Sequence, residues 1–249
     1  MLIDTHCHLY KAEYSNLEEV IKRMDGLMIT SGCGDVSNRE VLESIDKYDN
    51  VYGVLGIHPE EIDNITASSF AIIEKNINNP KIVGIGEIGL DYYWVKDNKE
   101  KQKELFEKQL LLAERYNKPV VVHNRDAHGD ILDMIKKYPS LSYVLHCYSG
   151  SVEMAKELLK YNVMFGIGGV ATFANADKIK EVIKEIDLEY LLLETDSPYL
   201  APVPYRGKQN EPAYADIIAA EVAKIKGKTK EEVIRKTYEN AVRKFDLPI

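Results

Sequence analysis

The stretch Ile3-Asp4-Thr5-His6-Cys7-His8 is a short strand-like run that carries two histidines one residue apart. Side chains alternate between the two faces of a β-strand, so His6 and His8 are expected to point the same way. Two imidazoles on one face form a ready pair of ligands for one metal ion. Cys7 is expected to point the opposite way, into packing.

Runs rich in β-branched residues recur along the chain at the interval of a strand, a turn and a helix. Eight of them cover residues 2–6, 27–33, 51–58, 82–87, 120–123, 143–146, 163–168 and 191–196, and their ends lie 22 to 36 residues apart. Apolar strands that alternate with helices predict a parallel sheet covered on its outside. The chain has 249 residues, and roughly 250 are typical of a barrel. The predicted fold is α/β, a (β/α)8 TIM barrel.

An open, doubly wound sheet is the alternative architecture. It usually has fewer strands and gives no reason for candidate ligands at so many strand ends. No Gly/Ser-rich linker divides the sequence, so residues 1–249 are predicted to form one domain.

The segments between the strands are predicted to be helices, over residues 101–116, 151–161, 176–186, 213–226 and 230–245 among others. Three helix starts are predicted from capping boxes at Ser15-x-x-Glu18, Ser37-x-x-Glu40 and Thr229-x-x-Glu232. The proline-containing stretch 200–212 follows the eighth strand, so it is expected on the same face as the strand ends.

Composition limits the function. Asp plus Glu is 40 and Lys plus Arg is 32, for a net charge of −8. This acidity excludes a general nucleic-acid-coating protein, although metal ions and a few basic residues can make a phosphodiester site locally positive. Three cysteines without a Cys-x-x-Cys predict no disulfide framework. Without a signal peptide or a long apolar run, the protein is expected to be cytoplasmic and free of membrane contact.

Histidines and carboxylates gather at the predicted strand ends, which in a barrel all open on one face. They are His6, His8, His58, Glu87, His123, His146 and Asp196. One buried histidine is usually just a satisfied core residue, but five of six at strand ends are hard to explain that way. His128 is the exception and is expected to be a solvent-facing residue in a loop or at a helix start.

Four imidazoles and two carboxylates suit a divalent ion such as Zn²⁺, Mn²⁺, Fe²⁺ or Ni²⁺. The set is too large for one tetrahedral site that keeps a position open for water, and about right for two ions that share a carboxylate. Two such ions can stabilise the entering and the leaving oxygen of a displacement.

The motifs around these residues resemble the TatD family of metal-dependent deoxyribonucleases, within the amidohydrolase superfamily. The resemblance rests on Asp4-Thr5-His6-Cys7-His8, Gly56-Ile57-His58-Pro59, the run from Gly86-Glu87 to Asp91-Tyr92-Tyr93, Val122-His123-Asn124-Arg125, Leu145-His146-Cys147 and Glu194-Thr195-Asp196-Ser197-Pro198-Tyr199. These motifs extend over nearly the whole chain. The resemblance implies cleavage of phosphodiester bonds in DNA, with a 3'-5' exonuclease-like action on single strands or strand ends.

The resemblance also implies roles for individual residues. One divalent ion would be held by His6, His8, Glu87 and Asp196, and a second by Glu87, His123 and His146. The ions could be Zn²⁺, Mn²⁺ or Mg²⁺. Glu87 would bridge them, and Asp196 would also be the general base that takes the proton of the attacking water.

Substrate contacts are implied for His58, Arg125 and Arg206, since a guanidinium suits a bidentate grip on phosphate. A surface or ion-pair role is the alternative for each arginine. The Tyr92-Tyr93-Trp94 cluster either stacks on a base or forms a packed lip of the barrel, and packing is expected for Tyr93 and Trp94.

Ile88 and Asn124 stand where many relatives carry a hydroxyl residue, and Tyr205 where many carry histidine. These departures affect substrate preference rather than metal binding.

Two other function classes remain open. The same site supports hydrolysis of an amide, an ester or a phosphotriester in a small molecule or an aminoacyl ester. The chain could instead be a binding protein that retains the metals without turnover. No obligate protein partner is evident in the sequence.

Overall fold

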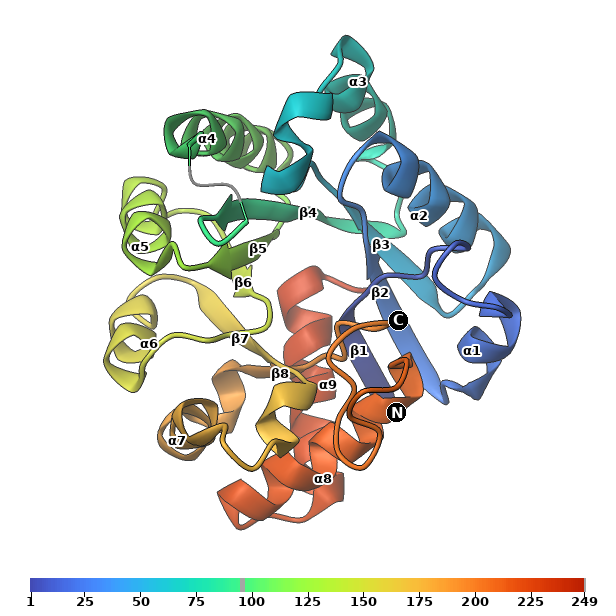
Figure 1. Ribbon diagram of the computed structural model, residues 1–249, viewed down its shortest axis with the longest axis vertical. Coiled ribbons are helices and arrows are strands. Elements are labelled where there is room, and N and C mark those ends of the chain that lie inside the picture. Colours follow the sequence, from blue (N-terminus) through green and yellow to red (C-terminus); the bar gives the residue numbers. More distant parts are fainter. Residues whose placement is uncertain (95–96, 249) are drawn as a thin grey trace.

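The computed structural model describes residues 1–94 and 97–248. Eight parallel strands follow one another around a barrel in sequence order, with helices outside them (Figure 1). The strands are β1 (Leu2–Cys7), β2 (Gly26–Ser31), β3 (Val51–Leu55), β4 (Ile82–Asp91), β5 (Val120–Arg125), β6 (Tyr143–Leu145), β7 (Val163–Ile167) and β8 (Leu191–Leu193). The predicted TIM barrel is confirmed, while the assignment of the whole chain to one domain stays a prediction.

The barrel closes between its first and last strands through the residues that follow β8. The Asp196 amide donates to the His6 carbonyl at 2.9 Å, and the His8 amide donates to the Ser197 carbonyl at 2.7 Å. The buried Asp4 carboxylate accepts a bond from the Thr195 amide at 2.9 Å. The N-terminal histidine pair therefore lies beside the end of the chain's last strand.

The helices that cover the strands are α1 (Leu17–Arg23), α2 (Asp35–Lys47), α3 (Ala67–Asn76), α4 (Lys99–Tyr116), α5 (His128–Lys137), α6 (Val152–Leu158), α7 (Asp177–Glu185), α8 (Ala215–Lys226) and α9 (Lys230–Phe245). Short 3-10 turns are η1 (Pro59–Asn64), η2 (Gly169–Thr172), η3 (Leu188–Tyr190) and η4 (Pro212–Tyr214).

One of the three predicted capping boxes is confirmed. Thr229 and Glu232 bond each other's backbone amides and start α9. The other two predictions are wrong. Helix α1 begins after Asn16, whose side chain accepts from the Glu19 amide, and α2 begins after Gly34. In both cases the chain turns into the helix at a residue other than the predicted serine, which leaves that serine outside the N-cap position.

Several strand ends also differ from the predictions. Strand β3 stops at Leu55, and His58 instead caps η1, where Pro59 pre-sets the first helical turn. Strands β6 and β8 stop before His146 and Asp196, because Cys147 (φ 44°) and Asp196 (φ 55°) adopt left-handed backbone conformations that a strand cannot continue. Strands β4 and β5 run further than predicted.

The hydrophobic core has two layers. The larger layer lies between the strands and the outer helices. The smaller layer combines one or two side chains from each strand, such as Ile3 and Val121, with Ala241 and Phe245 of α9 and the following Leu247. Helix α9 lies across the barrel behind the strands in this view (Figure 1).

Lys244, on α9, is a buried lysine at the start of β6 and β7. Its amino group donates to Ser142 Oγ at 2.9 Å and to the carbonyl and side-chain oxygens of Asn162 at 3.0 and 2.9 Å. Burial lowers the pKa of Lys244 to about 7. Between that value and the ordinary pKa near 10.5, the unfolded chain binds the proton and the folded chain does not.

We therefore expect the stability of the protein relative to a Lys244→Met variant to rise with pH from 7 to 10, by roughly 1 kcal/mol per pH unit. Urea unfolding of both proteins across this range measures the difference. Lys101→Met, on the exposed side of α4, is the control and should show no such slope. If the difference in stability between the wild type and Lys244→Met did not change with pH, the three acceptor atoms would be keeping Lys244 charged.

Candidate metal centre

The six predicted ligands come together at the C-terminal end of the barrel, although they lie on or directly after five different strands. On one side, His6 Nε2 lies 3.3 Å from His8 Nε2 and 3.3 Å from Glu87 Oε2. Asp196 Oδ1 lies 3.3 Å from His8 Nε2 and 3.6 Å from His6 Nε2. Four side chains thus direct potential ligand atoms at one point.

The second oxygen of Glu87 faces the remaining two predicted ligands. Glu87 Oε1 lies 2.8 Å from His123 Nδ1 and 2.8 Å from His146 Nε2, and those two nitrogens are 3.5 Å apart. The imidazoles of His6 and His146 stack with their centres 3.9 Å apart. Glu87 therefore stands between two groups of imidazoles, with one oxygen turned to each.

The chemistry of this donor set fits divalent cations. Groups of three donors lie within 4.8 Å of one another in His6, His8 and Glu87, and again in His6, His146 and Asp196. Buried imidazole nitrogens this close together are favourable when they share a cation as lone-pair donors. Burial alone would raise the pKa of Glu87, but His146, His6 and the hydrogen bond from His123 hold it well below its ordinary value. Glu87 is thus held as a carboxylate.

A β-bulge brings the histidine pair to the inside of the barrel. Ile3 belongs to the inner core, and strict alternation would turn His6 outward. The pairing of β1 with β2 gains one residue between Asp4 and Cys7, which shifts the alternation. Cys7 consequently packs in the outer core, as predicted, and its thiol lies 3.5 Å from the Ile29 carbonyl.

Two further carboxylates, which the sequence analysis did not single out, lie behind the histidines. Asp91 Oδ2 is 3.0 Å from His123 Nε2, so this imidazole is held between Asp91 and Glu87. Glu194 is fully buried; its Oε1 accepts from the Cys147 amide at 2.5 Å and lies 3.7 Å from His146 Nδ1. Carboxylates in such positions orient histidine ligands and raise their basicity.

Glycine at position 166 makes room for Glu194. A Cβ atom there would lie 2.0 Å from Glu194 Oε2. The sequence held a signal for both carboxylates, since Asp91 and Glu194 belong to two of the motifs that carry the family resemblance. Which histidine each one contacts depends on how neighbouring strands align.

Cys33 is another member of the site that was missed. Its Sγ lies 3.7 Å from Glu87 Oε2 and 4.0 Å from His8 Nδ1. The Tyr10 hydroxyl lies 3.0 Å from the same His8 nitrogen and donates to the Ser31 carbonyl. These groups line the side of His8 that faces away from Asp196.

The predicted substrate contacts lie at different depths. His58 is buried, with Nε2 3.7 Å from Glu87 Oε1, and burial lowers its pKa to about 3. It forms a possible donor group with Glu87 and His123. Arg125 and Arg206 are exposed, and each guanidinium lies over an aromatic ring, at 4.1 Å from Tyr93 and 4.2 Å from Phe173. His128 begins α5 and is partly exposed.

The prediction that Tyr93 and Trp94 pack in a lip of the barrel is wrong. Their exposed fractions are 47% and 62%, whereas Tyr92 is buried. The Tyr92 hydroxyl bonds Asp130 at 2.6 Å, which holds that ring against α5, whereas the side chains of Tyr93 and Trp94 are exposed.

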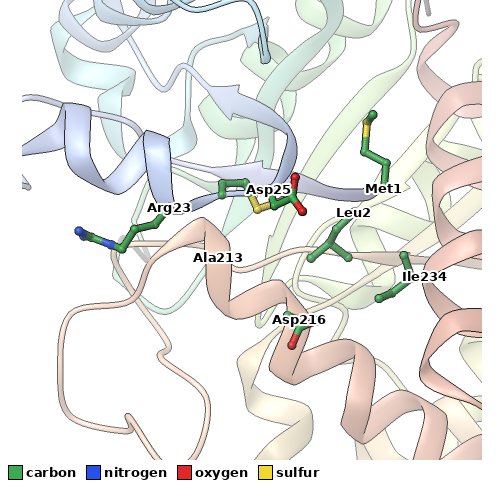
Figure 2. A pocket seen from close by; sticks show the side chains of 8 residues that line it. Met1, Leu2, Arg23, Asp25, Ala213, Asp216 and Ile234 are labelled. Atoms are coloured by element: carbon green, nitrogen blue, oxygen red, sulfur yellow. The ribbon is translucent and has the colours of Figure 1, made fainter.

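A separate hollow lies at the other end of β1. It is lined by Leu2, Arg23, Asp216 and Ile234 among others, between α1, α8 and α9 (Figure 2). Leu2 starts the strand whose far end carries His6 and His8. The hollow therefore lies away from the histidine cluster.

A parallel eight-stranded barrel with a buried histidine and carboxylate cluster at its C-terminal mouth fits the class of metal-dependent hydrolases. The sequence matches the family described as TatD related DNase over residues 3–246. The chain belongs to this family and is a metal-dependent hydrolase.

Individual relatives agree with this assignment. The chain is 41% identical to "uncharacterized metal-dependent hydrolase YabD" of Bacillus subtilis (strain 168), over 99% of this chain and 100% of that protein. It is 39% identical to "uncharacterized metal-dependent hydrolase MJ1582" of Methanocaldococcus jannaschii, over 98% and 96%. The crystal structure of YJJV, a TatD homolog from Escherichia coli K12, superposes with a TM-score of 0.90 at 29% identity, over 99% and 98%.

No helix within residues 1–94 and 97–248 is both long and apolar enough to cross a membrane. The cytoplasmic location stays a prediction.

Proposed function

We propose that this protein is a deoxyribonuclease that hydrolyses phosphodiester bonds of single-stranded DNA or of strand ends, in a 3'-5' exonuclease-like manner. One observation carries the proposal: Glu87 turns one carboxylate oxygen to each of two imidazole groups. This arrangement fits two divalent ions, and two ions suit the displacement of one phosphate oxygen by another. The name of the family supports DNA as the substrate.

In this proposal, His6, His8, Glu87 and Asp196 would hold one ion, and Glu87, His123 and His146 would hold the second. Zn²⁺, Mn²⁺ and Mg²⁺ are the candidates. When bound, the ions would lower the pKa of water towards neutral and offset the charge on the phosphate.

The protein's own residues position the substrate phosphate and take a proton from the attacking water. Asp196 and His123 are the more exposed members of the cluster, with side chains 13% and 16% accessible, so the substrate phosphate reaches the cluster past these two residues. Asp196 takes the proton of the attacking water. His58 contacts the phosphate from the Glu87 side, and the exposed Arg125 and Arg206 bind phosphates further out.

The experiment that tests the proposal is a cleavage assay on labelled single-stranded and duplex oligonucleotides, with panels of small esters, amides and phosphotriesters in parallel. Removal of the metal with a chelator should abolish cleavage. Each candidate ion is then added back to find which one restores it. Hydrolysis of an ester or amide without cleavage of DNA would favour the alternative hydrolase, with which the net charge of −8 agrees. Absence of turnover on every substrate at full metal occupancy would favour a binding protein.

Glu194 gives a prediction for metal binding itself. In Glu194→Gln, the side chain keeps its size but loses the charge that faces His146. We expect the affinity for one of the two ions to fall roughly 10- to 100-fold. Calorimetric titration of the metal-depleted protein measures this without an activity assay.

The control is Glu185→Gln, a loss of the same charge at the end of α7, which should leave both affinities unchanged. An unchanged affinity in Glu194→Gln would show that Glu194 supports the Cys147 backbone and not the metal centre.

A further inference from the structure

Exposed apolar side chains of the described residues concentrate at the C-terminal mouth of the barrel. Tyr93 and Trp94 follow β4, Tyr199, Leu200 and Val203 follow β8, and Val36 lies at the start of the helix after β2, whereas Met1 and Leu111 lie elsewhere. The chain exposes aromatic rings beside its ionisable cluster although burial would be more favourable. Such a distribution indicates a surface that a ligand covers.

The backbone that carries the two rings after β4 is held by Asp91, which also contacts a predicted metal ligand. Asp91 Oδ1 accepts bonds from the Tyr93 and Trp94 amides at 2.9 and 3.0 Å. The other oxygen of the same carboxylate lies 3.0 Å from His123 Nε2. One buried side chain therefore positions both a predicted metal ligand and the aromatic pair, so the rings have a defined place relative to the cluster.

Arg125 completes this surface. It pairs with Asp91 across β4 and β5, two residues beyond His123, which is about 7 Å further towards the mouth at roughly 3.3 Å per residue. Its guanidinium lies 4.1 Å from the centre of the Tyr93 ring and 5.3 Å from that of Trp94. The two rings stand edge to face, with centres 4.8 Å apart.

We propose that Tyr93, Trp94 and Arg125 form a stacking platform for an unpaired nucleobase of the substrate strand, next to the phosphate that is cleaved. This inference rests on the proposed function and names how the same site selects its substrate. An aromatic face accepts any base, and the guanidinium can hold the adjoining phosphate.

The charge of the protein supports a platform of this kind. At a net charge of −8, the chain does not attract nucleic acid through a broad basic surface. Stacking supplies affinity without positive charge, and it requires a base that is free of its partner strand. The platform therefore favours single strands over duplexes.

Trp94 is the one tryptophan in the sequence, so its fluorescence reports directly on the platform. The Asp196→Asn protein, loaded with metal, is titrated with a short single-stranded oligonucleotide, with the same strand lacking its bases, with a duplex, and with inorganic phosphate. Quenching by the first probe and not by the other three is the expected result. Equal response to phosphate alone, or no response to any probe, overturns the proposal.

A kinetic experiment on the wild-type background provides the second readout. Trp94→Leu is expected to raise KM for the single-stranded oligonucleotide roughly 5- to 100-fold, with a smaller effect on kcat, and Trp94→Phe should restore most of the loss. Leu111→Ala is the matched control, because Leu111 is also an exposed apolar side chain but lies on α4, and it should leave KM unchanged. An equal rise of KM in Trp94→Leu and Trp94→Phe would overturn the stacking role of this side chain.

The platform and the proposed function fail in different ways. Cleavage of DNA with an unchanged KM in Trp94→Leu overturns the platform and leaves the deoxyribonuclease in place. Quenching by the single strand without cleavage of any oligonucleotide supports the platform and overturns the nuclease assignment.

Discussion

Replacing Asp196 with asparagine is expected to lower the rate of oligonucleotide cleavage by roughly 10³-fold, within the range of about 10² to 10⁴ for loss of a general base. An amide keeps the shape of the side chain but cannot take the proton of the attacking water. Rates in single turnover, at saturating metal and substrate, measure the effect.

The fold should survive this substitution. Asp196 adopts a left-handed backbone conformation with φ 55°, which asparagine also tolerates. Asp246→Asn is the matched control, since that residue has φ 48° at the end of α9 and is far in the structure from the cluster. Both variants should melt as the wild type does. Full activity in Asp196→Asn at normal metal content would refute the role of Asp196 as the base.

The second large effect concerns the number of ions. A His6→Ala, His8→Ala double variant is expected to bind one divalent ion where the wild type binds two, since His123, His146 and Glu87 remain. The complementary His123→Ala, His146→Ala variant should likewise keep one. Both should lose at least about 10³-fold in activity, because one ion cannot stabilise both the entering and the leaving oxygen.

Elemental analysis after reconstitution and gel filtration measures the stoichiometry. Glu87→Gln provides the comparison, because it removes the carboxylate that both groups of histidines share. It should weaken the binding of both ions. Circular dichroism identifies any variant that fails to fold. One ion in the wild type, or loss of all metal in both double variants, would contradict the two-ion arrangement.

The architecture could be predicted because it leaves a periodic trace. Eight apolar runs at intervals of 22 to 36 residues indicate strands separated by helices. The right-handed strand–helix–strand connection then places all strand ends on one face. Convergence of His6 with Asp196, 190 positions later in the printed sequence, follows from this geometry and is seen in their 3.6 Å separation.

Local boundaries were predicted less well, because short-range signals compete. The motif Ser37-x-x-Glu40 has the form of a capping box, yet the N-cap of α2 is Gly34, three residues before Ser37. Ser37 Oγ instead accepts from the Cys33 amide at 2.8 Å and stabilises the turn after β2. A four-residue pattern does not determine which of two adjacent turns its hydroxyl serves.

By itself, the sequence determined the barrel, the set of candidate ligands and the exclusion of a broadly basic nucleic-acid binder, since period, residue type and charge are properties of the chain alone. Only the tertiary structure decided the bulge that turns His6 inward, the place of Asp91 and Glu194 behind their histidines, and the exposure of Tyr93 and Trp94. These features depend on the register between neighbouring strands, where a shift of one residue moves every side chain to the opposite face.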